Sequence, residues 1–106
     1  MNLKLVVDRR VSLEIQPSSV TAHVGSRLEL RCVSLPSLPS LAKLDRLVMT
    51  WVKDGQILVS RGRYSVSGGT LVIYSVTMDD QGLYQCISNS GGQEHIATAT
   101  VFLGGM

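Results

Sequence analysis

Apolar and polar residues alternate over many short stretches of this chain, and turn-forming residues separate the stretches. In residues 27–33, for example, Leu28, Leu30 and Cys32 alternate with Arg and Glu. Successive side chains of a strand point to opposite faces, so this pattern predicts a strand with one buried and one solvent-facing side. Outside one loop, no stretch keeps apolar residues at helical spacing over several turns. The chain is therefore predicted to be all-β.

The remaining strands follow from the same alternation. Asp54-Gly55 and Gly68-Gly69 tolerate positive φ and predict turns between them. Pro17 and the serines after it separate the first two strands, which is typical of an edge strand that breaks and changes partner. Roughly seven to eight short strands usually close as two sheets over one core. Besides 27–33, the predicted strands span residues 11–15, 20–24, 48–53, 70–74, 82–88 and 95–103.

The length and composition fit one folded domain. The chain has 106 residues, of which 44% are hydrophobic and 17% are charged, a charge content too low for a disordered chain. We expect the domain to span residues 11–103, with residues 1–10 as a linker and residues 104–106 as a tail. A net charge of +2 is too weak to indicate nucleic-acid binding. No apolar stretch approaches the roughly 20 residues that cross a bilayer, so direct membrane insertion is not expected.

Two cysteines and one tryptophan fall on inward-facing positions of the predicted strands. Trp51 lies between Cys32 and Cys86 in the sequence. A disulfide between the cysteines would link the two sheets, with the Trp51 ring against its sulfurs, and the closure of so long a loop stabilises a domain by roughly 4 kcal/mol. The hydroxyl of Tyr84, two residues before Cys86, can bond back to the backbone. Leu71, also on an inward position, is a predicted core residue.

These residues and the motifs around them resemble the immunoglobulin fold of the intermediate (I-set) or C2 kind. The motifs are Cys32, the run Trp-Val-Lys-Asp-Gly from Trp51, the run Gly-Thr-Leu-Val-Ile from Gly69, and the run Asp-Asp-Gln-Gly-Leu-Tyr-Gln-Cys that ends at Cys86. The resemblance covers about residues 11–103 and implies an antiparallel β-sandwich of two sheets with Greek-key connections. The interval from Trp51 to Cys86 is too short for the extra strand pair of a variable domain.

The resemblance also implies an ion pair between Arg63 and Asp80, because such domains often pair an Asp before the second cysteine with a basic residue on an earlier strand. The alternative is a solvated surface contact worth about 0–1 kcal/mol. The interval from Cys32 to Trp51 is longer than such domains usually have, which leaves the conformation of that loop open.

That loop, residues 34–47, carries leucines at every third position, a spacing that no strand can direct to one core. It can run extended to Pro39 and continue as a short helix capped by Ser40. Its leucines then either cover the end of the sandwich or remain exposed as a partner-binding or self-association patch, for which the candidates are Leu35, Leu38 and Leu41.

Sites for chemistry are not evident in the sequence. His23 and His95 lie on opposite strand faces, and no cysteine or histidine pair has the close spacing of a zinc site. No serine lies in a nucleophile elbow, and no Gly-Gly pair precedes a helix start that could bind phosphate. No Asn-x-Ser/Thr acceptor is present either. We therefore expect no catalytic residues, no metal and no cofactor.

The expected function is that of a protein-binding or spacer domain in an extracellular adhesion, receptor or matrix protein with several such modules. The compartment follows from the cysteines, because disulfides persist in oxidising environments. Two alternatives remain open. One is an intracellular spacer with a reduced cysteine pair, similar to the domains of giant muscle proteins. The other is a glycosaminoglycan-binding module that uses Arg27, Arg31, Arg61 and Arg63 on one outer face.

Overall fold

The computed structural model describes residues 12–35, 49–90 and 93–104. This part of the chain forms nine strands and one short 3-10 helix, η3. The elements are β1 (Ser12–Gln16), β2 (Ser19–His23), β3 (Leu28–Leu35), β4 (Met49–Lys53), β5 (Gln56–Leu58), β6 (Tyr64–Ser67), β7 (Thr70–Ile73), η3 (Met78–Asp80), β8 (Gly82–Ser90) and β9 (Gln93–Gly104).

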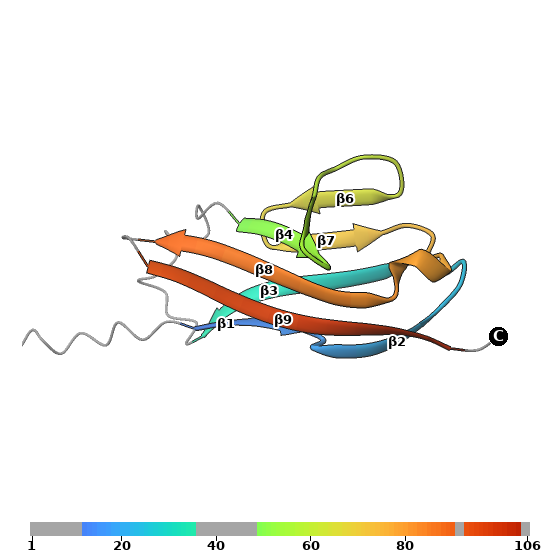
Figure 1. Ribbon diagram of the computed structural model, residues 1–106, viewed down its shortest axis with the longest axis horizontal. Coiled ribbons are helices and arrows are strands. Elements are labelled where there is room, and N and C mark those ends of the chain that lie inside the picture. The colour runs from blue at the N-terminus through green and yellow to red at the C-terminus, as the bar shows by residue number, and fades with distance from the viewer. Residues whose placement is uncertain (1–11, 36–48, 91–92, 105–106) are drawn as a thin grey trace, which may run out of the picture.

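The strands form two sheets packed face to face, which confirms the predicted all-β sandwich (Figure 1). One sheet has four strands in the order β1-β3-β7-β6, and the other has five strands in the order β2-β9-β8-β4-β5. Every pairing is antiparallel except that of β2 with β9, which is parallel. Among the described residues, no helix is long and apolar enough to cross a membrane.

The first two strands belong to different sheets although they follow each other in sequence. β1 pairs with β3 in the four-stranded sheet, whereas β2 pairs with β9 in the five-stranded sheet. Pro17, preceded by a cis peptide bond, lies between them. Proline has no N–H to donate to a ladder, so a strand readily ends there. The predicted change of partner at this edge is confirmed.

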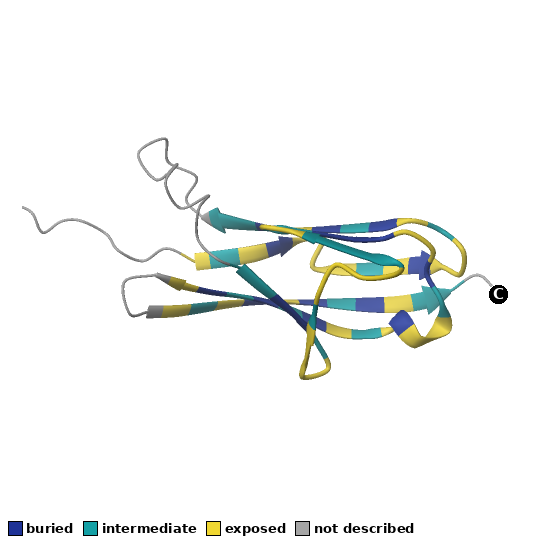
Figure 2. Ribbon diagram, turned by 90° about the horizontal axis from the view of Figure 1, so that it is seen from above, coloured by how far each residue is buried: buried dark blue, intermediate teal, exposed yellow. Residues whose placement is uncertain are grey.

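The core lies between the sheets, where the inward positions of the alternating strands meet (Figure 2). Its largest members, Trp51 and Tyr84, have no exposed surface. Burial of a large apolar side chain contributes about 1.5–3 kcal/mol, so the inward positions provide most of the favourable energy of folding. Leu71 is also fully buried, as expected for a core residue. The other fully buried apolar residues include Leu30, Ile73, Val76, Cys86 and Val101.

Two strands were not predicted, namely β5 and β6. β5 has only three residues, and Ile57 at its centre is 68% exposed, so it has no buried face for an alternating pattern to reveal. β6 is half-buried along most of its length. Both lie at the edge of a sheet, where one side of the strand has no neighbour.

Candidate functional site

A disulfide joins Cys32 on β3 to Cys86 on β8 and so links the two sheets across the core. The two Cα atoms are 6.4 Å apart, within the usual range for a disulfide, and the cysteines are separated by 54 positions in the sequence. Cys86 is fully buried and Cys32 is 6% exposed. The bond therefore lies in a dry interior, as the inward positions of both residues predicted.

Trp51 lies on β4 directly across from Cys86 on β8. Its indole Nε1 donates a hydrogen bond to the carbonyl oxygen of Gly68, 3.3 Å away, so the ring is buried without leaving its polar atom unpaired. Met49, on the same face of β4, places its sulfur 3.8 Å from the Cys86 sulfur. Gly69 is required nearby, because a Cβ at this position would lie 2.8 Å from the Cys32 carbonyl oxygen.

Asp80 is the only charged residue with no exposed surface among the described residues. Its Oδ2 lies 2.7 Å from the Arg63 guanidinium and accepts the Thr77 backbone N–H at 2.7 Å, while its Oδ1 accepts the Tyr64 hydroxyl at 2.6 Å. Burial raises the pKa of the carboxyl, but the hydrogen bonds from Arg63, Thr77 and Tyr64 together outweigh this effect and lower the pKa of Asp80. The structure thus places Arg63 and Asp80 in a partly buried ion pair rather than in a solvated contact.

Tyr84 connects η3 to the strand that follows it. Its buried hydroxyl donates a hydrogen bond to the backbone carbonyl oxygen of Asp80 at 2.6 Å. Burial is the main reason that the pKa of Tyr84 is raised, with the nearby Asp80 charge second, so the hydroxyl stays protonated and remains a donor. Thr77 caps η3 in turn, because its side chain accepts the Asp79 N–H. This corner is a structural site, in which each polar group binds another part of the same domain.

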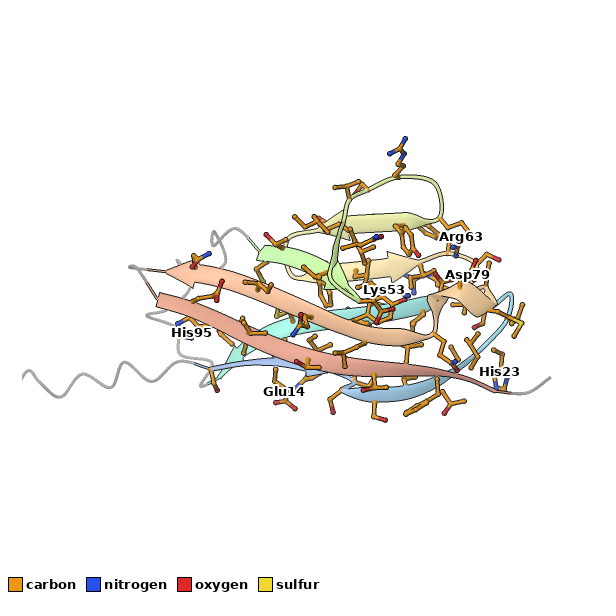
Figure 3. All side chains as sticks on the ribbon, in the orientation of Figure 1. Glu14, His23, Lys53, Arg63, Asp79 and His95 are labelled. Atoms are coloured by element: carbon orange, nitrogen blue, oxygen red, sulfur yellow. A yellow bond between two sulfur atoms is a disulfide. The ribbon has the colours of Figure 1, made fainter. Side chains whose placement is uncertain are left out.

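The two histidines lie at opposite ends of the domain (Figure 3). His23 pairs with Gly104 at one end of β9, whereas His95 lies near the other end, so the two rings cannot share a ligand. Within the residues described, no group of three or more His, Cys, Asp or Glu side chains is arranged to hold a metal ion.

Three of the four arginines proposed for glycosaminoglycan binding lie beside acidic residues. Glu29 lies 3.1 Å from the Arg27 guanidinium and 2.7 Å from that of Arg31. The hydrogen bonds from Arg31 and then from Arg27 lower the pKa of Glu29, so it remains ionised beside them. Arg63 is bound to Asp80. Two carboxylates therefore offset half of the positive charge that the sequence predicted for this face, and the structure gives no acidic partner to Arg61 among the described residues.

The leucine-spaced loop lies mostly outside the described residues. Leu35 is the last residue of β3, while Leu38 and Leu41 fall between residues 36 and 48, which the structure does not describe. The partner-binding patch suggested for these leucines stays a prediction.

A comparison with known families matches residues 12–89 to the family model described as immunoglobulin domain. The chain belongs to the immunoglobulin domain family. Among curated proteins, it is similar to cell adhesion molecule Dscam2 of Drosophila melanogaster, with 34% identity over 103 residues that cover 96% of the chain. Human protein turtle homolog B is 28% identical over 87% of the chain. The chain spans only about 5% and 6% of these two proteins, respectively.

The chain is also similar to immunoglobulin domains in the solved structures of two different proteins. The immunoglobulin domain superposes on a structure of the N-terminal four Ig domains of Dscam1 isoform 1.9 with a TM-score of 0.68, at 25% identity over 89% of this chain and 21% of that one. It also superposes on a chain of a titin M10–obscurin-like 1 Ig complex with a TM-score of 0.64, at 27% identity over 88% of both chains.

One surface of this immunoglobulin domain was not recognised from the sequence. Leu83, Ile96 and Phe102 project from the outer face of the five-stranded sheet and are 43%, 49% and 49% exposed. The alternation in residues 95–103 already placed Ile96 and its neighbours opposite the buried alanines. A comparison of the apolar residues at these outward positions with those at the outward positions of residues 82–88 could have identified the surface from the sequence.

Proposed function

We propose that this immunoglobulin domain is a protein-binding and spacer module of a larger, extracellular protein and performs no chemistry itself. The disulfide between the sheets carries the proposal, because a buried pair of cysteines remains oxidised in secreted and cell-surface proteins. The similarity to Dscam2, an adhesion molecule, and to turtle homolog B supports the same assignment. The polar groups at the Asp80 corner all bind within the domain, which fits a structural rather than a catalytic role.

Within the family, the strand arrangement supports the I-set or C2 kind. A variable domain adds a pair of strands to the sheet that holds Cys86, whereas the described residues add β5 alone. The first strand is divided between the sheets as β1 and β2.

An intracellular spacer is the second candidate, and the similarity to the titin M10–obscurin-like 1 complex is the observation that favours it. The oxidation state of the two cysteines distinguishes the candidates. We expect protein that is unfolded during lysis in the presence of a thiol-blocking reagent to contain no blocked cysteine until it is reduced, since both cysteines are buried in the folded domain. Intact mass spectrometry before and after reduction measures this directly. Two blocked thiols in the untreated sample would instead support the intracellular spacer.

A further inference from the structure

The outer face of the five-stranded sheet combines exposed apolar residues with a near absence of charge. Along its two longest strands, β8 and β9, the outward positions carry Thr, Gln, Asn, Ile, Leu and Phe. Of the outward positions described, only Glu94 at one end of β9 and His23 beside the other end are ionisable. A face of this composition cannot select a charged ligand, but it can pack against a surface that is equally neutral.

On β8 and β9 the apolar residues of this face form two clusters with polar residues between them, while Val52 on β4 and the exposed Ile57 on β5 add apolar surface level with Gln85, between the two clusters. Ile96 lies directly across from Ile87 on the neighbouring strand. Leu83 pairs with Thr100 and is therefore the diagonal neighbour of Phe102. Ile96 and Phe102 are six positions apart on one face of β9, which corresponds to roughly 20 Å.

The opposite side of the sandwich has a different character. Its outward positions carry Glu14 on β1 and Glu29 and Arg31 on β3. If two copies met through this charged face, like charges would lie against each other unless the register of the two sheets paired each acidic residue with a basic one. The chain as a whole carries a net charge of +2, so the neutral face is the one on which two copies approach with the least repulsion.

We infer that the neutral face binds a second copy of this chain about a two-fold axis near Ala99, an inference that rests on the proposed protein-binding function. Ala99 lies midway between Ile96 and Phe102. A two-fold axis that is parallel to the sheet and perpendicular to the strands at this level makes β9 antiparallel to β9 of the second copy. The cluster of Ile96 and Ile87 then lies over the cluster of Phe102 and Leu83 from the other chain, and the same contact forms twice. A two-fold interface requires such self-complementarity, which a binding site for an unrelated protein does not.

The size of the face suits a weak dimer. With strands about 4.8 Å apart and a rise of about 3.3 Å per residue, the five strands offer roughly 600–800 Å². A standard interface buries about 800 Å² per partner, so this contact belongs at the lower end of stable interfaces. A dissociation constant in the micromolar range or weaker is expected, which suits adhesion through many copies at once.

Sedimentation equilibrium of the purified, disulfide-bonded domain tests this inference over about 10 μM to 1 mM. The wild-type domain is expected to dimerise with increasing concentration. Ile96→Lys and Phe102→Glu are each expected to weaken association by at least about tenfold, because each buries an unpaired charge in the interface. When the two variants are mixed, the Lys of one chain lies over the Glu of the other, and a heterodimer should form.

The matched controls are Tyr74→Lys and Tyr74→Glu. Tyr74 is 56% exposed and follows β7 in the opposite sheet, so both changes should leave association unchanged. A wild-type domain that stays monomeric, face substitutions without effect, or a mixture without heterodimer would each overturn the inference. A monomer with its disulfide intact would still leave the proposed function standing, whereas free thiols in the source protein would contradict that function whatever the state of association.

Discussion

Asp80 shows how one residue links the stability of the domain to pH. Its carboxylate has no exposed surface and binds Arg63, Tyr64 and the Thr77 backbone. Because its pKa is lowered in the folded state, the unfolded state binds the proton more tightly at acidic pH. The stability contributed by the ionised carboxyl is therefore full above its ordinary pKa of 3.8 and is lost as the pH falls through the lower, folded value.

Asp80→Asn is expected to lower the free energy of unfolding by about 2–4 kcal/mol near neutral pH, since it leaves the Arg63 charge without its partner. The lower half of that range is expected, because the Arg63 side chain is 35% exposed. Urea unfolding at about pH 7 and about pH 3 measures the effect, and the difference from wild type should shrink at the lower pH. Asp79→Asn, at an exposed neighbour, is the control and should change stability by less than about 0.5 kcal/mol. An equal loss at both pH values would contradict the assigned role of the charge.

The sequence predicted this site only in part. The resemblance to immunoglobulin domains gave the pair of Arg63 with Asp80, since both residues lie at the positions where the family has such a pair. It did not give the Tyr64 hydroxyl or the Thr77 backbone as further partners. Those contacts depend on how β6 and the start of η3 converge on one carboxylate, and no sequence spacing encodes that convergence.

At the scale of elements, the turn after β4 fits closely against the start of β8. Asp54, at φ +48°, accepts the Leu83 N–H through Oδ1 at 3.2 Å and donates its own N–H to the Leu83 carbonyl oxygen at 3.0 Å. Gly82 has a φ of +149°, and a Cβ there would lie 2.6 Å from Asp54 Oδ2. The glycine is thus required both by its backbone conformation and by the approach of a neighbouring turn.

Gly82→Ala is expected to destabilise the domain by about 1–3 kcal/mol, the usual range for a strained backbone with a close contact. The same change should cost less in an Asp54→Gly background, because the obstructing carboxylate is then absent. Gly62→Ala measures the cost of a positive φ without a close contact, since Gly62 has a φ of +57° and nothing within 4 Å of the added Cβ. Chemical unfolding of the single and double variants measures the coupling. An identical cost in both backgrounds would show that the contact with Asp54 does not matter.

Strands with one buried face were predictable from alternation, and strands without one were not. β3 and β9 place alternate residues such as Leu30 and Val101 in the core, so the phase of the alternation predicted both the strands and their orientation. β5 lies at a sheet edge with Ile57 exposed, and only its pairing with β4 defines it as a strand. Val72 faces outward on β7 but is only 8% exposed, because Glu29 and Ser65 flank it on both neighbouring strands. Burial of this kind depends on neighbouring strands and is absent from the local pattern.

At the scale of the whole molecule, the disulfide is the covalent link between two sheets that otherwise meet mainly through apolar packing. It closes a loop with a sequence separation of 54, and the chain-entropy relation gives a loop of this length about 4 kcal/mol. The combined change Cys32→Ala with Cys86→Ala should therefore lower the melting temperature by roughly 20 °C, since each kcal/mol corresponds to about 4–8 °C in a domain of this size. Thermal unfolding followed by circular dichroism measures the shift.

Reduction of the wild-type domain breaks the disulfide but keeps both sulfur atoms in the core, so it tests the covalent link without changing the packing. It should therefore produce most of the same decrease in melting temperature. If the reduced domain instead melted within a few degrees of the oxidised one, packing around Trp51 alone would hold the sheets together, and the domain would be as well suited to a reducing compartment as to an oxidising one.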